Sequence, residues 1–449
     1  MVALFLAMGV LAGFSLGMFL AGLLIVKYGP RGLLLKKRKL LEMQTLIKKL
    51  TWGTFFETRQ RAQTGKPLDR PYGRKGAVFD WDKIQFNPVY LSRLPLYSGA
   101  EVDTTVILGP QAARPLELKI PIINGGMAYG SGYSLAAKLA LAKGAAMAGT
   151  AANTGNGAFL EEERESAEKL IIQYTRGFWS KAPEILKQAD MIEIALGHSA
   201  RGPAPVRIQG RKLTPDVAAR YGTIPGLDIL MEARLPEVEN KGDFKNLVQY
   251  LKEVSGGVPI AVKFGATHYL EQEMGIFVEG GADVLVFDGL EGGTHGGAPL
   301  IMDDIGLPIF PALCRAAVFF EKNSLRGRIS LVVGGGLITP GCFAKCLALG
   351  ADAVIIGTIT ALAQAHSQVT KALPWEPPTG LLYNDGKEKN KYNIDLGAKH
   401  LANYYQSCVH EMRLLAGALG KSKLRDLNKD DLVALDPVHA AVAGIKYQS

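Results

Sequence analysis

Cysteine is scarce in this sequence: the 449 residues contain four, at positions 314, 342, 346 and 408. So few cysteines, spaced irregularly, exclude the disulfide framework of a small secreted module. Charged residues make up 21% of the chain and hydrophobic residues 48%, a balance that excludes wholesale disorder. Glycine is abundant, with 52 residues. That abundance is typical of many tight strand-to-helix turns, or of backbone that a ligand approaches closely.

A broad basic surface is also lacking. The formal net charge is +9, but residues 27–49 contain eight basic residues and one acid, which leaves about +2 for the rest of the chain. The composition therefore gives no extended face for nucleic acid. The local basic cluster is suited to anionic lipid headgroups.

Charged side chains are absent from residues 2–26. A helix of about 25 residues is long enough to cross a hydrocarbon core of ~30 Å. A cleaved signal peptide is the alternative, but it would have a shorter apolar run preceded by Lys or Arg. Because the basic cluster follows the span, the positive-inside rule predicts a single-pass membrane protein with the rest of the chain in the cytoplasm.

Small residues recur within this span at Gly9, Gly13, Gly17 and Ala21. A spacing of four places them on one helix face, which favours packing against a second transmembrane helix, from a partner or from another copy of the chain. Glycine is also common in membrane helices in general, so the pattern is compatible with no partner at all.

Short apolar runs alternate with helical periods through the rest of the chain, which is typical of a parallel sheet buried on both faces. The eight runs are 119–124, 145–150, 170–175, 191–196, 258–264, 282–288, 329–333 and 353–357. Helical periods between them include 134–143, 181–189, 243–254, 270–280 and 340–349. Eight such units predict an α/β fold that closes into a (β/α)8 TIM barrel. The glycines after the first run, 125–130, fit a Rossmann fingerprint poorly.

Four parts of the chain follow from these patterns. We expect a transmembrane anchor over 1–27 and a basic juxtamembrane segment with an N-terminal extension over 28–100. The barrel is predicted over 101–362. A C-terminal helical extension that packs on the barrel is predicted over 363–449.

The last two runs end in glycine, where barrels commonly bind phosphate. Gly334, Gly335 and Gly336 follow the seventh run, and Gly357 and Thr358 follow the eighth. Glycine lets backbone N–H groups reach phosphate oxygens, and threonine can cap the next helix or donate to the ligand. This pair of motifs predicts a phosphate-bearing ligand; the alternative is that the glycines only form a turn.

Single polar residues lie near the ends of other runs: Asn153, Gln173, Glu193 and Lys263. A lysine inside a barrel must be paired or face a ligand, because burial of an unpaired charge is costly. Beside a flavin, Lys263 could stabilise negative charge on the N1/O2 edge of the reduced ring, with amide contacts from Asn153 and Gln173. The alternative is a structural Lys263–Glu193 pair.

Two long loops are expected at the same end of the barrel, over 197–241 and 291–297. Arg201 in the first loop could hold a dicarboxylate such as 2-oxoglutarate, although surface arginines on long loops are common. His295 in the second loop could donate a proton or contact substrate, or face solvent.

Four stretches together resemble the FMN-binding barrel of the glutamate synthase family: 123–155, 258–263, 287–299 and 332–358. The resemblance covers roughly residues 70 to 445 and implies FMN as the cofactor. On it, the cofactor-binding residues are expected to be Gly126, Met127, Asn153, Gln173, Lys263, Gly292, Gly293, Gly335, Gly336, Gly357 and Thr358. Lys263, Gln173 and His295 are the expected catalytic residues, Arg201, Glu291 and Thr294 the expected substrate contacts, and no metal site is expected.

The chain departs from the family pattern at several points. An acidic residue is missing after Asn153-Thr154-Gly155 and again in the loop after the fourth run, and Gly334 stands where the family usually has aspartate. The segment 363–383, which in glutamate synthases supplies cysteines for an iron–sulfur cluster, has none. A separate electron donor is therefore expected.

The resemblance implies a membrane-anchored FMN oxidoreductase that acts on a 2-oxo acid or amino acid such as 2-oxoglutarate or glutamate. Two alternatives remain at this stage. One is a transferase similar to the N-methylglutamate synthases, and the other is a non-catalytic FMN-binding subunit for assembly or electron relay in a membrane complex.

Overall fold

The computed structural model describes residues 41–42, 44–45, 53–54, 56–66, 68–74, 76–198, 200–369 and 377–448. The chain divides into two compact units, Met1–Leu68 and Asp69–Ser449. In the first unit, residues 56–64 are helical. The predicted membrane span over 2–26 lies outside the described residues. Among the residues that are described, no helix combines the length and the apolar character needed to cross a membrane.

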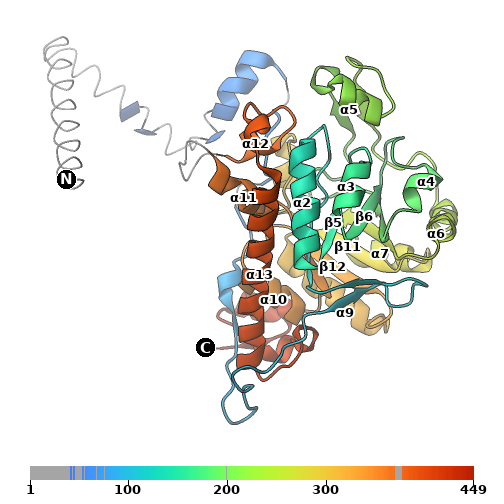
Figure 1. Ribbon diagram of the computed structural model, residues 1–449. Coiled ribbons are helices and arrows are strands. Elements are labelled where there is room, and N and C mark those ends of the chain that lie inside the picture. Colours follow the sequence, from blue (N-terminus) through green and yellow to red (C-terminus); the bar gives the residue numbers. More distant parts are fainter. Residues whose placement is uncertain are drawn as a thin grey trace, which may run out of the picture. The chain divides into compact units, whose positions relative to one another are not determined.

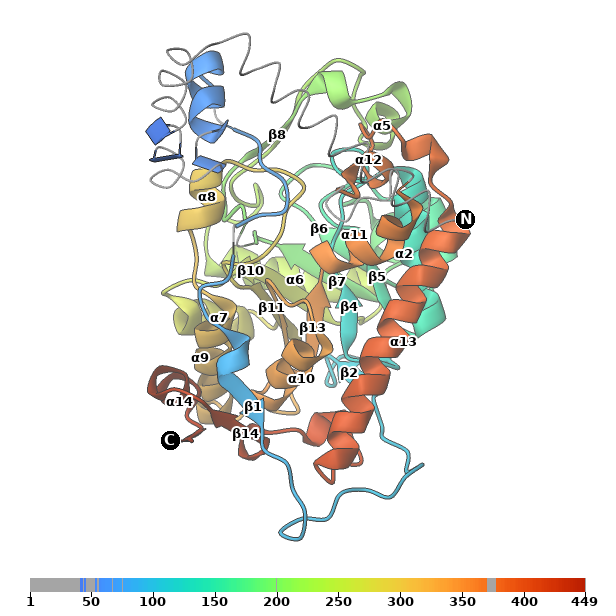
Figure 2. The ribbon, with the colours of Figure 1, turned by 90° about the vertical axis from the view of Figure 1, so that its left-hand side faces the viewer.

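The second unit is built around a parallel eight-stranded sheet (Figures 1 and 2). Its hydrogen-bonded order is β4-β13-β12-β11-β10-β7-β6-β5, and β4 and β5, at the two ends of this order, lie against each other, so the barrel is nearly closed. The predicted α/β barrel is confirmed. The strands are β4 (Ile122–Asn124), β5 (Ala151–Asn153), β6 (Lys169–Tyr174), β7 (Met191–Ala195), β10 (Ile260–Gly265), β11 (Val284–Asp288), β12 (Ser330–Gly334) and β13 (Ala353–Ile356).

The second of the eight predicted strands was placed wrongly. Residues 145–150 complete helix α2 (Leu135–Ala148) and its C-cap Gly149, and the strand β5 begins only at Ala151. The run is apolar because α2 is buried on most of its surface, and its alanines favour helix. Gly149 ends the helix with a positive φ of 71°, a conformation that favours glycine.

The barrel interior is apolar toward the amino-terminal ends of its strands. Inward-facing residues of successive strands, among them Ile171, Val286 and Val332, form one buried cluster. The hairpin of β2 (Val106–Leu108) and β3 (Leu116–Leu118) adds leucines to this cluster. The backbone N–H of Gly109, just after β2, donates to Ser330 Oγ at the first residue of β12, at 3.1 Å. The hairpin therefore closes the amino-terminal end of the barrel and leaves the carboxyl end for a ligand.

Helix α13 (Ile394–Ala418) packs along α2 on the outside of the barrel (Figures 1 and 2). A Cβ built at Gly144 of α2 would lie 3.0 Å from the Ala398 carbonyl oxygen, so glycine allows this close approach. The other helices are α3 (Glu161–Ser166), α4 (Pro183–Leu186), α5 (Pro215–Arg220), α6 (Lys241–Ser255), α7 (Leu270–Glu279), α8 (Pro299–Asp304), α9 (Ile309–Lys322), α10 (Pro340–Ala348), α11 (Thr358–Ala365), α12 (Thr379–Leu382) and α14 (Pro437–Ala443).

Besides the β2–β3 hairpin, the described residues form two further small sheets. One joins β1 (Ile84–Phe86), β14 (Leu432–Ala434) and β15 (Lys446–Tyr447), so residues before and after the barrel pair with each other. The other is the antiparallel pair of β8 (Val206–Ile208) and β9 (Ile229–Met231), within the long insertion after β7.

The hairpin that closes the barrel offers a matched test of packing. Leu108 is fully buried in the interior cluster, whereas the adjacent Ile107 is 46% exposed. We expect Leu108→Ala to lower the free energy of unfolding by about 2–5 kcal/mol, since it leaves a cavity. Ile107→Ala should cost less than about 1 kcal/mol in the same urea titration. Equal losses of unfolding free energy in the two variants would contradict the conclusion that this hairpin closes the barrel.

Candidate active site

At the carboxyl ends of the strands, the inward-facing positions of the barrel include several polar residues, which we call the polar layer. Asn153, Gln173, Glu193, Lys263 and Asp288 lie at or near the carboxyl ends of five different strands, and each is at most 9% exposed. In β11 the inward positions Val284 and Val286 are apolar and the next, Asp288, is a carboxylate. This polar layer lies on the apolar interior, at the end where barrel enzymes carry their chemistry.

Glu193 orients the two amides of this layer. Asn153 Nδ2 and Gln173 Nε2 donate to Glu193 Oε1 at 3.2 and 2.6 Å. An ionised carboxylate only accepts hydrogen bonds, so both amides turn their oxygens away from it. Asn153 Oδ1 accepts from the backbone N–H of Gly155 at 2.9 Å. Gln173 Oε1 and Glu193 Oε2 are buried and have no hydrogen-bond partner among the described residues, as expected where a ligand donor binds.

Lys263 contributes the positive charge of the layer. Its Nζ lies 4.0 Å from Asp288 Oδ2. Burial works to lower the pKa of Lys263, but the charges of Asp288 and Glu193 outweigh burial and raise it above its ordinary value. The lysine is therefore charged at neutral pH. Asp288 was not among the predicted site residues, although the alternation of β11 could have identified it as inward-facing.

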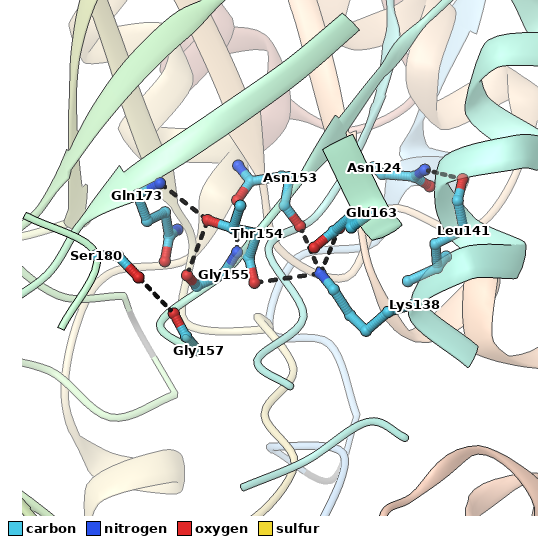
Figure 3. Close-up of polar contacts among 10 residues, drawn as sticks. All are labelled: Asn124, Lys138, Leu141, Asn153, Thr154, Gly155, Gly157, Glu163, Gln173 and Ser180. Atoms are coloured by element: carbon cyan, nitrogen blue, oxygen red, sulfur yellow. Dashed lines mark hydrogen bonds and ion pairs between the residues drawn. The ribbon is translucent and has the colours of Figure 1, made fainter. Parts of the chain in front are cut away.

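A fully buried ion pair supports the end of β5 from outside the barrel (Figure 3). Lys138 Nζ of α2 lies 2.7 Å from Glu163 Oε1 and donates to the carbonyl oxygens of Asn153 and Thr154 at 2.9 and 3.2 Å. Thr154 Oγ1 in turn accepts from the backbone N–H of Gln173 at 3.0 Å. Lys138 thus fixes the backbone from which Asn153 reaches the polar layer.

The glycine motifs of β12 and β13 lie beside this layer. Gly335 and Gly336 have φ values of 109° and 67°, which strain any residue with a side chain. Gly357 precedes α11, and no side chain caps this helix. The Thr360 N–H donates to the Gly357 carbonyl oxygen at 3.0 Å, so the N–H groups of Thr358 and Ile359 are the ones that face an anion at this end. This arrangement suits the phosphate predicted there.

Other predicted cofactor contacts converge on the same place. A Cβ built at Gly126 would lie 2.8 Å from Asn153 Oδ1 and 2.9 Å from Gln173 Nε2, so the loop after β4 passes directly over both amides. A Cβ at Gly293 would lie 2.5 Å from Thr358 Oγ1. One at Gly357 would lie 3.2 Å from Met127 Cε. Loops from β4, β11 and β13 therefore meet at the mouth.

Arg201 joins the two long loops. Its Nε donates to Thr294 Oγ1 at 3.0 Å, its Nη2 lies 3.3 Å from His295 Nε2, and it also donates to the Gly296 carbonyl oxygen. The three predicted residues Arg201, Thr294 and His295 are thus brought together. Burial, followed by the charges of Arg201 and Lys212, lowers the pKa of His295 to about 3. The imidazole is neutral at physiological pH.

Glu291, a predicted substrate contact, has a structural partner. Its Oε2 accepts from the backbone N–H of Ile309 at the start of α9, at 3.0 Å. A Cβ built at Gly336 would lie 2.6 Å from Glu291 Cβ, so the side chain packs against the glycine turn. Sequence reasoning also missed Arg176, which is 4% exposed and donates to the carbonyl oxygens of Pro203 and Ala233.

No group of three or more His, Cys, Asp or Glu side chains suited to a metal ion occurs in the part of the chain that the structure describes. The four cysteines are free thiols. The polar layer itself consists of one lysine, two amides and two carboxylates.

The barrel is shared with flavin enzymes of known structure. A double mutant of flavocytochrome b2 with pyruvate bound superposes with a TM-score of 0.51 at 14% identity, over 83% of this chain and 81% of that chain. A mutant flavocytochrome b2 with benzoylformate also gives a TM-score of 0.51, at 16% identity, over 80% of both chains. At such identities the likeness establishes the fold class alone.

The family follows from sequence comparison. The conserved region in glutamate synthase matches residues 91–422. A glutamate synthase large subunit-like protein of Rhizobium meliloti is 32% identical over 412 residues, which cover 87% of this chain and 92% of the relative. An archaeal-type glutamate synthase [NADPH] of Thermotoga sp. is 30% identical over 349 residues, which cover 77% of this chain and 69% of the relative. The chain belongs to the glutamate synthase family, as its motifs predicted, and this membership supports FMN as the cofactor.

The ion pair beneath Asn153 gives a prediction on stability. Lys138→Met leaves the Glu163 carboxyl buried without its partner, and we expect a loss of about 3–5 kcal/mol in the free energy of unfolding. Lys143, on the same helix, pairs at 2.8 Å with Asp395, whose side chain is 84% exposed. Lys143→Met should therefore cost at most about 1 kcal/mol. Urea titration of both variants measures the difference, and similar losses would refute the role of Lys138.

The low pKa of His295 gives a prediction on acid stability. An unfolded histidine titrates near pH 6.5, whereas the folded one titrates at about 3. Between these values the unfolded chain binds a proton that the folded chain does not, so His295 lowers stability as the pH falls from about 6.5 towards 3. Between these pH values, the free energy of unfolding of His295→Gln, measured by chemical denaturation, should fall less than that of the parent. His268→Gln, at an exposed histidine, controls for loss of an imidazole as such.

Proposed function

We propose that this protein is an FMN-dependent oxidoreductase of glutamate synthase type that acts on a 2-oxo acid or amino acid, such as 2-oxoglutarate or glutamate. The polar layer at the barrel mouth carries the proposal. It combines a charged lysine, buried acceptors without partners and glycine loops at one end of an otherwise apolar barrel. Membership of the glutamate synthase family supports the choice of substrate class.

FMN fits the residues present. Gln173 Oε1 is a buried acceptor without a described partner and suits the N–H of the flavin's pyrimidine ring. Lys263 suits the N1/O2 edge, where negative charge develops on reduction. The glycines of β12 and the first turn of α11 suit the phosphate. When bound, FMN supplies the two-electron acceptor or donor for oxidation or reduction at the substrate carbon.

The chain's own residues would bind and orient the substrate. Arg201 already holds the 294–296 loop and presents a guanidinium that can pair with a carboxylate. His295, being neutral, can exchange hydrogen bonds with substrate without adding charge. The two loops that Arg201 links would exclude water from the mouth.

Electrons would come from outside this chain. The segment 363–383 contains no cysteine. We propose a separate donor, either a partner protein, a quinol or a nicotinamide nucleotide. We further propose that residues 2–26 anchor the protein in a membrane with the barrel in the cytoplasm, that the basic cluster contacts lipid, and that the small-residue face packs on a partner helix or a second copy. Recovery in the membrane fraction until detergent is added would support the anchor, and recovery in the aqueous fraction would contradict it.

Replacement of Lys263 tests the proposed reaction. In anaerobic mixing with glutamate, bleaching of the flavin absorbance should be slower by roughly 100-fold or more in Lys263→Met, because charge stabilisation at the ring is lost. Lys345 is also buried, but its Nζ binds the Trp81 carbonyl oxygen at 2.7 Å, away from the mouth. Lys345→Met should therefore react as the parent does.

Two results would contradict the proposal. One is an equal rate in the parent and Lys263→Met, which would remove the lysine from the chemistry. The other is turnover of glutamate with the flavin spectrum unchanged throughout, which would instead favour the transferase reaction.

A further inference from the structure

Two carboxylates face a single lysine in the polar layer. Asp288 Oδ2 lies 4.0 Å from Lys263 Nζ, and Glu193 acts on the same ammonium. Glu193 has a second task, since its Oε1 accepts from both amides. Asp288 is the second carboxylate at this ammonium, and its distance to Lys263 is the observation that the following inference uses.

The space at Gly334 explains how Asp288 reaches this position. Asp288 and Gly334 are paired in register on neighbouring strands β11 and β12. A Cβ built at Gly334 would lie 2.6 Å from Asp288 Oδ1, so any side chain at 334 would collide with this carboxylate. Position 334 is where the family pattern usually has aspartate. The absence of a side chain at 334 therefore leaves room for the Asp288 carboxylate.

We propose that Asp288 is a positioning residue that partly neutralises Lys263 and thereby lowers the reduction potential of the bound FMN. The inference rests on the proposed function, because it requires FMN at the barrel mouth. Reduction adds two electrons and one proton to the ring, which leaves a negative charge at its N1/O2 edge. The Lys263 ammonium stabilises that charge, and a carboxylate 4.0 Å from the ammonium opposes it.

The sign of the effect follows from this geometry. When the Asp288 charge is removed, Glu193 remains as a counter-charge, so Lys263 stays protonated. The ammonium then attracts the negative charge of the reduced ring more strongly, because one of the two carboxylates that offset it is gone. Reduced FMN should then bind more tightly relative to oxidised FMN. The layer would thus hold Lys263 charged and ordered while limiting how strongly it favours the reduced cofactor.

The test is the midpoint potential of the FMN-loaded full-length protein, measured by equilibration with a dye of known potential during reduction by dithionite. We expect Asp288→Asn to bind reduced relative to oxidised FMN roughly tenfold more tightly, which corresponds to a rise of about 30 mV for a two-electron couple. Asp283→Asn, at the residue immediately before the same strand, is the matched control. Asp283 is 7% exposed and accepts from the Ile260 N–H at 2.9 Å and from Lys252 Nζ at 2.8 Å, at the other end of the barrel. It should leave the potential unchanged.

Exchange of the carboxylate between strands gives the second variant. Gly334 does not have a positive φ. With residue 288 shortened, the nearest remaining atom to a Cβ at 334 is the Ile355 carbonyl oxygen, at 3.0 Å, so aspartate fits there with a small shift of the backbone. The double variant Asp288→Ser with Gly334→Asp should return the potential to the parent value, whereas Asp288→Ser alone should raise it. This rescue separates a charge effect from a purely structural one.

Distinct outcomes bear on the two proposals. Protein that takes up no FMN would overturn the proposed function. Protein that binds FMN, with the same potential in the parent and in Asp288→Asn, would overturn the role of Asp288 alone. A change in the KM for substrate without a change in potential would likewise overturn it, since the carboxylate would then serve the substrate.

Discussion

The need to accommodate one buried charge governs the carboxyl end of this barrel. Lys263 lies in a buried layer directly above a cluster of aliphatic side chains, and an unpaired ammonium there would be very costly. Two carboxylates, Glu193 of β7 and Asp288 of β11, provide the opposite charge. One of them turns the amides of Asn153 and Gln173, and the other fills the space left by Gly334. The polar layer is thus one interdependent unit rather than a set of independent contacts.

The rest of the unit holds this layer in place. The hairpin of β2 and β3 closes the opposite end with leucines. The buried pair of Lys138 and Glu163 fixes the carbonyl groups at the end of β5. Arg201 ties the loops after β7 and β11 together above the mouth. A rigid barrel that is closed at its amino-terminal end by a hairpin, and whose loops are linked at the carboxyl end, is the arrangement expected of a site that binds one ligand in one orientation.

Much of this architecture is readable from the sequence, because buried parallel strands leave a strong apolar signal. Seven of the predicted runs overlap barrel strands, whereas the run 145–150 belongs to α2. That error arose because a helix covered by another helix is as apolar as a strand. Lys263 and Gln173 could be singled out because a polar residue within an apolar run is conspicuous.

Other features depend on contacts that no local pattern reveals. Lys138 occurs in an alanine-rich helix, where a lysine usually marks the solvent face, and only the packing of Glu163 from α3 shows that it is buried. Asp288 resembles an ordinary strand-terminal acid until its distance to Lys263 is known. Glu291 stays a predicted substrate contact, and its hydrogen bond to the start of α9 is a further contact that the sequence did not reveal. Each of these assignments requires the relative placement of two elements distant in sequence.

The central claim is that the polar layer and glycine loops form an FMN site. The visible absorption spectrum of the purified full-length protein, with chromatography of the cofactor released by acid, tests it most directly. The account predicts a yellow protein that releases about one FMN per chain. Colourless protein that takes up no added FMN would contradict it, and Lys263 and its carboxylates would then be a structural cluster.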